Sequence, residues 1–190
     1  EDEAVYTILV HPTNPNLLYV GGWHGLFISY DGGDHWTERH PDLPIYVSAI
    51  AMDPRDPSTM YAGTWDDGIY KSVDLGETWF ILDEDGSPSR HLATFQLTVD
   101  PAWPYPVYVA TAQGVYGSLD GGASWRNLNA SGYYMGVVLD PDEPGRGLLV
   151  GENLSNLGIR RGLRLDARQF LPLMMKQNTV AGVHVKLRQD

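Results

Sequence analysis

Short apolar segments recur along the chain at nearly even intervals, separated by polar turns rich in Gly, Pro and Asp. Each segment is about five residues long and rich in β-branched and aromatic side chains, which is typical of strands. No window shows the sustained 3.6-residue periodicity of a capped helix. The pattern therefore predicts an all-β chain. The four segments are Leu18–Gly22, Met60–Thr64, Val107–Thr111 and Leu148–Glu152.

A second apolar stretch precedes each segment and ends at a His-Pro or Asp-Pro dipeptide. Proline forces a turn at these points because it fixes φ and has no N–H donor. The second residue of each stretch is small or polar, which suits an innermost strand where repeated sheets converge and space is short. The stretches are Tyr6–Val10, Ser48–Met52, Phe95–Val99 and Met135–Leu139, and their small or polar residues are Thr7, Ala49, Gln96 and Gly136. A third strand, which comes after each five-residue segment, opens at Gly25, Gly68, Gly114 or Gly158.

An eight-residue phrase, Ser-x-Asp-x-Gly-x-x-Trp, occurs three times where the third strand of a repeat turns into a fourth. We expect its Asp carboxylate to accept bonds from backbone N–H groups and its Gly to take a positive φ. The Trp is expected on strand four, packed between sheets, where burial contributes roughly 2–4 kcal/mol. These roles are structural rather than catalytic. The residues are Ser29, Asp31, Gly33 and Trp36; Ser72, Asp74, Gly76 and Trp79; and Ser118, Asp120, Gly122 and Trp125.

The repeat length predicts the architecture. The aspartates at 31, 74 and 120 are 43 and 46 residues apart, which fits one four-stranded propeller blade. We therefore expect an all-β chain, a β-propeller of four-stranded antiparallel blades, over residues 1–165, with a divergent basic segment at 166–190 that closes the ring or docks elsewhere. The blades are 5–46, 47–94, 95–134 and a degenerate 135–165. Four blades is the low end for a closed ring, so a small, an incomplete and a larger propeller all stay open.

The phrase resembles the Asp-box, or BNR repeat. The pattern Asp-Pro-x-x-Pro-x-x-x-Tyr-x-Gly accompanies it. Together these motifs make the chain, from residue 5 to about 162, resemble the propellers of sialidases, xyloglucan-cleaving glycosidases, the sortilin luminal domain and photosystem II stability factors. The resemblance implies the fold and an exported, extracytoplasmic protein (secreted, periplasmic or lumenal). It implies little about activity, because one fold serves enzymes, receptors and scaffolds. The chain has no Cys, which departs from the Cys-rich segment expected of sortilin relatives.

Charge is divided unevenly along the chain. Residues 1–144 carry 21 acidic and 5 basic side chains (−16), whereas residues 145–190 carry 3 acidic and 8 basic (+5). An acidic body of this kind argues against nucleic-acid binding, and the basic end either is a variable tail or docks on an acidic surface. No apolar run is long enough for a transmembrane helix. The His spacing suggests no metal site, and nothing implies a cofactor.

Candidate binding residues lie in the loops between the second and third strands and in the connections between blades, which should share one face. Trp23 and Trp65 occupy matching positions in adjacent repeats and could form an aromatic platform for sugar rings or a protein partner. Simple shielding of the blade ends is the alternative. The acidic residues of these loops could bind a hard cation, although ordinary solvated loops are the more frequent case. The candidates are Trp23, His24, Trp65, Asp66, Asp67, Tyr133 and Tyr134; the connections also carry His40–Asp42 with Tyr46, and Asp83–Asp85 as a further acidic loop.

Three functional hypotheses follow. The favoured one is a non-catalytic propeller that acts as a protein-binding or assembly module, because no catalytic residues can be assigned. The second is a glycoside hydrolase, xyloglucanase-like or sialidase-like, or a fragment of one. Sialidase relatives would need an arginine triad that the first three repeats do not match, and inverting cleavage would need two carboxylates roughly 6.5–9.5 Å apart across a cleft. The third is a structural subunit of a large assembly.

Overall fold

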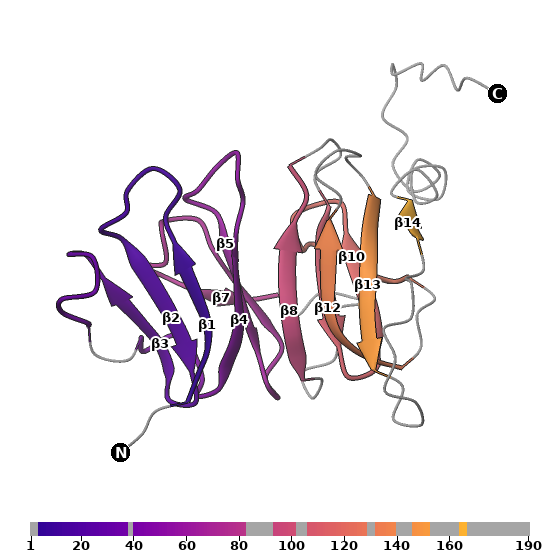
Figure 1. Ribbon diagram of the computed structural model, residues 1–190, viewed down its shortest axis with the longest axis horizontal. Helices are drawn as coiled ribbons and strands as arrows, with labels where there is room; N and C mark the ends of the chain where they lie inside the picture. Colours follow the sequence, from indigo (N-terminus) through magenta and orange to yellow (C-terminus); the bar gives the residue numbers. More distant parts are fainter. Residues whose placement is uncertain are drawn as a thin grey trace.

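In the computed structural model the chain forms four antiparallel sheets that follow one another in sequence order (Figure 1). The structure describes residues 4–37, 40–82, 93–101, 106–128, 132–139, 146–152 and 164–166, and none of these is helical. The predicted all-β propeller architecture is confirmed, and a partial propeller fits the array. The expected Gly158 strand opening, the acidic loop 83–85 and residues 167–190 lie outside the described residues.

Neighbouring strands in the sequence pair with each other within each sheet, in the order expected of a meander. The first sheet holds β1 (Val5–Val10), β2 (Leu18–Gly22) and β3 (Gly25–Ser29). The second holds β4 (Val47–Met52), β5 (Met60–Thr64), β6 (Ile69–Ser72) and β7 (Phe80–Ile81). The third holds β8 (Thr94–Val99), β9 (Val107–Thr111), β10 (Gly114–Ser118) and β11 (Arg126–Asn127). The fourth holds β12 (Tyr133–Leu139), β13 (Arg146–Glu152) and β14 (Arg164–Asp166).

The first strands of successive sheets lie against one another: β1 contacts β4, β4 contacts β8, and β8 contacts β12. Each of them has a one-residue irregularity near its start, after Val5, Val47, Thr94 and Tyr134. A bulge of this kind bends the strand and increases its twist. The small or polar residues expected on an innermost strand directly follow these bulges.

Glycines in the second strands let the next sheet approach closely. A Cβ at Gly21 would lie 2.8 Å from Cγ1 of Val47, and a Cβ at Gly63 would lie 2.3 Å from Cγ2 of Thr94. Val47 and Thr94 begin the first strands of the following sheets. The absence of a side chain at both glycines therefore sets the distance between neighbouring blades.

The apolar core is divided into layers between the sheets. Tyr19 and Leu26 of the first sheet pack with Met60 and Trp79 of the second. A second layer joins the second and third sheets, and a third joins the third sheet to β12. Among the described side chains, the buried apolar residues of the first three sheets therefore pack against a neighbouring sheet.

The three eight-residue phrases, here called Asp hairpins (residues 29–36, 72–79 and 118–125), have the same internal hydrogen bonds. In the second hairpin, Ser72 Oγ donates to Asp74 Oδ1 (2.7 Å) and accepts from Gly76 N–H (2.9 Å). Asp74 Oδ1 also accepts from the backbone N–H of Thr78 (3.0 Å). The central glycines Gly33, Gly76 and Gly122 all have positive φ.

The tryptophans of the Asp hairpins differ in their surroundings. Trp79 and Trp125 are buried, at 7% and 4% exposure, directly before β7 and β11. Trp36 is 42% exposed and lies outside any strand, so the expectation that it packs between sheets is wrong. Trp79 is covered by the first sheet, whereas the described residues place no sheet over the corresponding side of Trp36.

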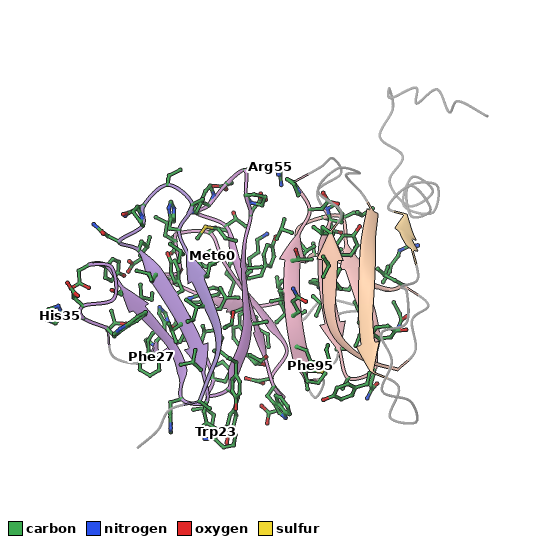
Figure 2. All side chains as sticks on the ribbon, viewed as in Figure 1. Trp23, Phe27, His35, Arg55, Met60 and Phe95 are labelled. Carbon is green, nitrogen blue, oxygen red and sulfur yellow. The ribbon has the colours of Figure 1, made fainter. Side chains whose placement is uncertain are left out.

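The two ends of the blades carry different features. The Asp hairpins adjoin the Pro-containing turns, since Gly32 N–H donates to Asn16 O (2.9 Å) and Leu75 N–H donates to Ser58 O (3.1 Å). Figure 2 shows Arg55, from one of these turns, at the upper edge, and Trp23 and Phe95 at the lower edge. The lower edge holds the loops between the second and third strands.

Candidate aromatic binding surface

The backbone places Trp23 and Trp65 in equivalent positions at the lower edge. Each directly follows the second strand of its sheet and donates its N–H to the residue before the first strand. The bonds are Trp23 N–H to Ala4 O (2.9 Å) and Trp65 N–H to Tyr46 O (3.1 Å). Ala112 makes the same bond in the third sheet, to Ala93 O (3.1 Å), so that repeat has the geometry but no ring.

Each of these tryptophans packs edge-to-face against a ring at the start of the next sheet: Tyr46 directly precedes β4, and Phe95 lies in β8. Trp23 and Tyr46 have ring centroids 4.4 Å apart at 89°, and Trp65 and Phe95 are 5.7 Å apart at 87°. Phe95 also contacts Tyr133, at 4.6 Å and 42°. We call these five residues the aromatic row. The neighbouring rings hold Trp23 and Trp65 in place. Because these tryptophans remain 48% and 47% exposed, about half of each residue stays open to a ligand.

Tyr46 connects the two parts of the aromatic row through its backbone. Its N–H donates to Trp23 O (3.1 Å), and its carbonyl accepts from Trp65 N–H. Its φ is +68°, a conformation uncommon for a residue with a large side chain. Backbone strain of this kind persists only where the surroundings hold it. Here the strained residue joins the loops of two adjacent blades through its two backbone bonds.

The sequence predicted only part of this arrangement. Trp23, Trp65 and Tyr133 belong to the row, and so does Tyr46 from the connection between the first two blades, but Phe95 was expected only as part of a first strand. The available signal for Tyr46 was its position in the connection between the first two blades, directly before the first strand of the second sheet. Tyr134, a predicted site residue, instead packs against the core layer between the third sheet and β12, because adjacent strand residues point to opposite faces.

The polar candidates do not converge on one point. His24 and Asp66 are exposed near the row. Asp67 accepts a hydrogen bond from the Tyr70 hydroxyl (2.8 Å), and its N–H donates to Thr64 Oγ1 (3.0 Å). Within the described ranges, no three His, Asp or Glu residues are grouped so that they could hold a metal ion. The acidic loop that could have faced Asp66 and Asp67 is outside those ranges.

Two polar residues of the first connection have structural contacts. His40 Nε2 lies 3.1 Å from Glu77 O, and Asp42 Oδ2 accepts from Trp79 N–H (3.3 Å). Both bonds join the first repeat to the second Asp hairpin. This connection therefore stabilises the contact between blades.

The pKa values of the Asp-hairpin carboxylates Asp31, Asp74 and Asp120 are lowered, as is the pKa of Asp56 in a Pro-containing turn. The pKa of Asp31 is lowered to about 2, chiefly by the His35 backbone N–H and then by the His35 ring. The pKa of Asp74 is also lowered, chiefly by the Thr78 hydroxyl. Hydrogen bonds to the ionised form cause both shifts, so these carboxylates are held as anions and serve the turns.

No protein-family model matches the chain. A probable oligoxyloglucan-reducing end-specific xyloglucanase of Neosartorya fischeri is 25% identical over an alignment of 149 residues, and the match covers 67% of this chain and 18% of that protein. Among solved structures, a GH74 enzyme from Niastella koreensis matches with a TM-score of 0.65 at 24% identity, over 77% of this chain and 24% of that one. YCF48 bound to a D1 peptide matches with a TM-score of 0.58 at 15% identity, over 79% and 47%.

The chain has the β-propeller fold. It spans about a fifth of the xyloglucanase and about a quarter of the GH74 enzyme. The structural neighbours include both glycoside hydrolases and a peptide-bound propeller. No helix among the described residues is long and apolar enough to cross a membrane.

Proposed function

We propose that the chain is a non-catalytic binding segment of a propeller and that the aromatic row holds its ligand. The observation that carries the proposal is the pair of half-exposed tryptophans at equivalent positions, each packed against a ring at the start of the next sheet. Ligand sites combine pre-arranged apolar and aromatic surface with few polar groups. His24 and Asp66, exposed beside the tryptophans, supply such polar groups.

A polysaccharide with a β-glucan backbone is the ligand class we infer for this surface. Flat rings spaced along one edge suit a chain of pyranose units, whose faces are apolar. The xyloglucanase relative and the GH74 neighbour support this class. We further propose that the Asp hairpins are Asp-boxes and that the protein acts outside the cytoplasm, as the sequence predicts.

Calorimetric titration with xyloglucan oligosaccharides tests the proposal. Trp23→Ala and Trp65→Ala should each weaken binding about tenfold, because each removes one stacking ring and about 1.4 kcal/mol corresponds to a factor of ten. Phe80→Ala is the matched control, since Phe80 is also 48% exposed but lies on the outermost strand β7. Equal affinity of the wild type and both tryptophan variants would exclude the aromatic row as the glycan site.

Protein recognition is the second candidate, favoured by the structural likeness to YCF48 bound to a D1 peptide. The same variants distinguish the two ligands. Peptide or partner capture that depends on Trp23 and Trp65, without measurable glycan binding, would support the protein-binding module. If that partner is a permanent component of a larger complex, the chain is a structural subunit of a large assembly, as the third hypothesis states.

A hydrolase segment is a third reading, favoured by the curated xyloglucanase relative. Cleavage needs two carboxylates on opposite sides of the scissile bond. Asp66 is the exposed carboxylate beside the row, and its partner would have to come from elsewhere. Release of reducing sugar from xyloglucan that is abolished by Asp66→Asn would establish this activity and overturn the non-catalytic proposal.

A further inference from the structure

The first sheet presents an apolar face that points away from the second sheet. The equivalent face of the second sheet is packed against the first. Residue by residue, Ile8 is 64% exposed where Ile50 is 8%, and Val5 is 51% exposed where Val47 is 0%. We call this surface the open face; it consists of Val5, Ile8, Val10, Leu18, Val20 and Trp36. Figure 1 places the first sheet at one end of the array.

The repeat register identifies what the open face lacks. In the two covered cases, a tyrosine from the second strand of the preceding sheet reaches the turn of the next Asp hairpin. Tyr19 Oη donates to Leu75 O (2.7 Å), and Tyr61 Oη donates to Gly121 O (3.3 Å). Gly32 occupies the equivalent place in the first hairpin. The tryptophans beside the two covered turns are buried, whereas Trp36 beside Gly32 is 42% exposed.

The second strand supplies another matching feature two residues after its tyrosine. Gly21 receives Val47, and Gly63 receives Thr94, at the start of the following sheet. Val5 occupies the register position of Val47, since each pairs with the last residue of its second strand. A sheet that covered the open face would therefore present a glycine to Val5 and a tyrosine to the Gly32 carbonyl.

We propose that the open face binds a further blade of this same repeat, carried on a longer form of the polypeptide, with a Tyr-x-Gly second strand. A second copy of the chain is a poorer occupant. The sheet at the other end of its array has the second strand Arg146–Glu152, which contains no tyrosine. Solvent exposure of several apolar side chains on one face is itself unfavourable.

The test extends the intact chain by one blade in register. A second copy of residues 47–92 is placed ahead of the chain and joined directly to Ala4. Ala4 then takes the place of Ala93, because both alanines lie directly before the first strand of a sheet and accept the same backbone bond. The protein is labelled with 5-fluorotryptophan, and the resonance of Trp36 is assigned from Trp36→Phe. Its shift between H2O and D2O reports the contact of this ring with solvent. We expect that shift to fall to the level of Trp79 in the extended chain.

A matched control keeps the added blade but blocks its docking. Gly63→Val in the duplicated copy alone should place a side chain against Val5 and restore the exposed signal of Trp36. Trp36 that stays exposed in the extended chain, at the level of the unextended one, would overturn the proposal. So would shielding of Trp36 in the unextended chain that grows with concentration alongside a dimer in sedimentation, because the occupant would then be a second copy.

Discussion

At the scale of single residues, the Asp hairpins show how one geometry accepts different donors. The second carboxylate oxygen of the aspartate is bound by the Thr78 hydroxyl (2.6 Å), the Ser124 hydroxyl (2.6 Å) or, in the first hairpin, the His35 ring nitrogen Nδ1 (2.7 Å). All three positions lie four residues after the aspartate. The backbone N–H at this position supplies the other bond in each case, so the side chain there can vary.

The pH dependence of the first hairpin follows from these bonds. The pKa of Asp31 is about 2 in the folded chain against 3.8 ordinarily. Its ionised form therefore contributes stability above the unfolded pKa, and this contribution is lost as the pH falls through about 4 to 2. His35→Ala removes the ring donor but keeps the backbone N–H donor, so we expect the pKa of Asp31 to return part of the way, as measured by NMR titration of its carboxyl carbon.

Asp74, whose donors come from Thr78 and Ser72, provides the internal reference in the same spectra. Its titration should be unchanged by His35→Ala. An Asp31 pKa that does not move in this variant would show that the His35 ring has no part in holding the carboxylate ionised.

At the scale of the elements, glycine in the second strand decides how closely the blades pack. Gly63 lies in β5 with no positive φ, so its role is space rather than backbone freedom. Thr94 of the next sheet occupies the volume that a side chain would need. The single hydroxyl proton of Ser48, at the bulge of β4, is within hydrogen-bond reach of the backbone carbonyls of both Gly63 and Thr94, so apolar contact and hydrogen bonding coincide at this junction.

Gly63→Ala should lower the free energy of unfolding by about 1–3 kcal/mol, the usual cost of overpacking, as measured by urea denaturation. The new Cβ would lie 2.3 Å from Thr94 Cγ2 and 2.9 Å from Thr94 Cβ, and a β-branched side chain has little freedom to move. Gly117→Ala, in strand β10, is the matched control because its nearest neighbour is the more flexible Leu128, at 3.3 Å. A smaller loss for Gly63→Ala than for Gly117→Ala would contradict this account.

At the scale of the whole molecule, the array is held together by contacts that each join one blade to the next. Tyr19 and Tyr61 are the clearest, since each is buried in one sheet and donates its hydroxyl to the hairpin of the following sheet. Lys71 adds a second donor to the Gly121 carbonyl (2.9 Å). The same nearest-neighbour character explains why an end face remains apolar and exposed.

These tyrosines make the array sensitive to alkali. Burial, followed by the charge of Asp53, raises the pKa of Tyr61 from 10.0 to about 12, and burial also raises the pKa of Tyr19. The folded chain therefore keeps its phenolic protons longer than the unfolded chain. The resulting stability is complete below pH 10 and declines as the pH rises from 10 to 12. Tyr61→Phe should make this decline less steep in denaturation curves recorded across that range.

The exposed Tyr6→Phe variant, at a residue that is 44% exposed, is the control and should leave the alkaline decline as it is in the wild type. A decline that Tyr61→Phe does not alter would assign the alkaline sensitivity to other groups.

Features that depend on neighbours in the chain could be predicted from sequence alone. The strands around each Pro turn are present, with starts shifted by one or two residues, and β6 begins one residue after Gly68. The hydrogen bonds of the Asp hairpins span two to four residues, so the local phrase is sufficient to specify them. The shared position of Trp23 and Trp65 likewise follows from the strand period and the repeat length.

Only the tertiary structure decided which side chains meet across repeats. The same Ser-x-Asp-x-Gly-x-x-Trp pattern leaves Trp36 exposed and Trp79 buried, because burial depends on whether a neighbouring sheet covers the hairpin. Tyr46 and Phe95 support the two exposed tryptophans because their rings approach from the start of the next sheet. Such contacts depend on the spacing and twist between sheets, which close approach at Gly21 and Gly63 sets and which no single repeat encodes.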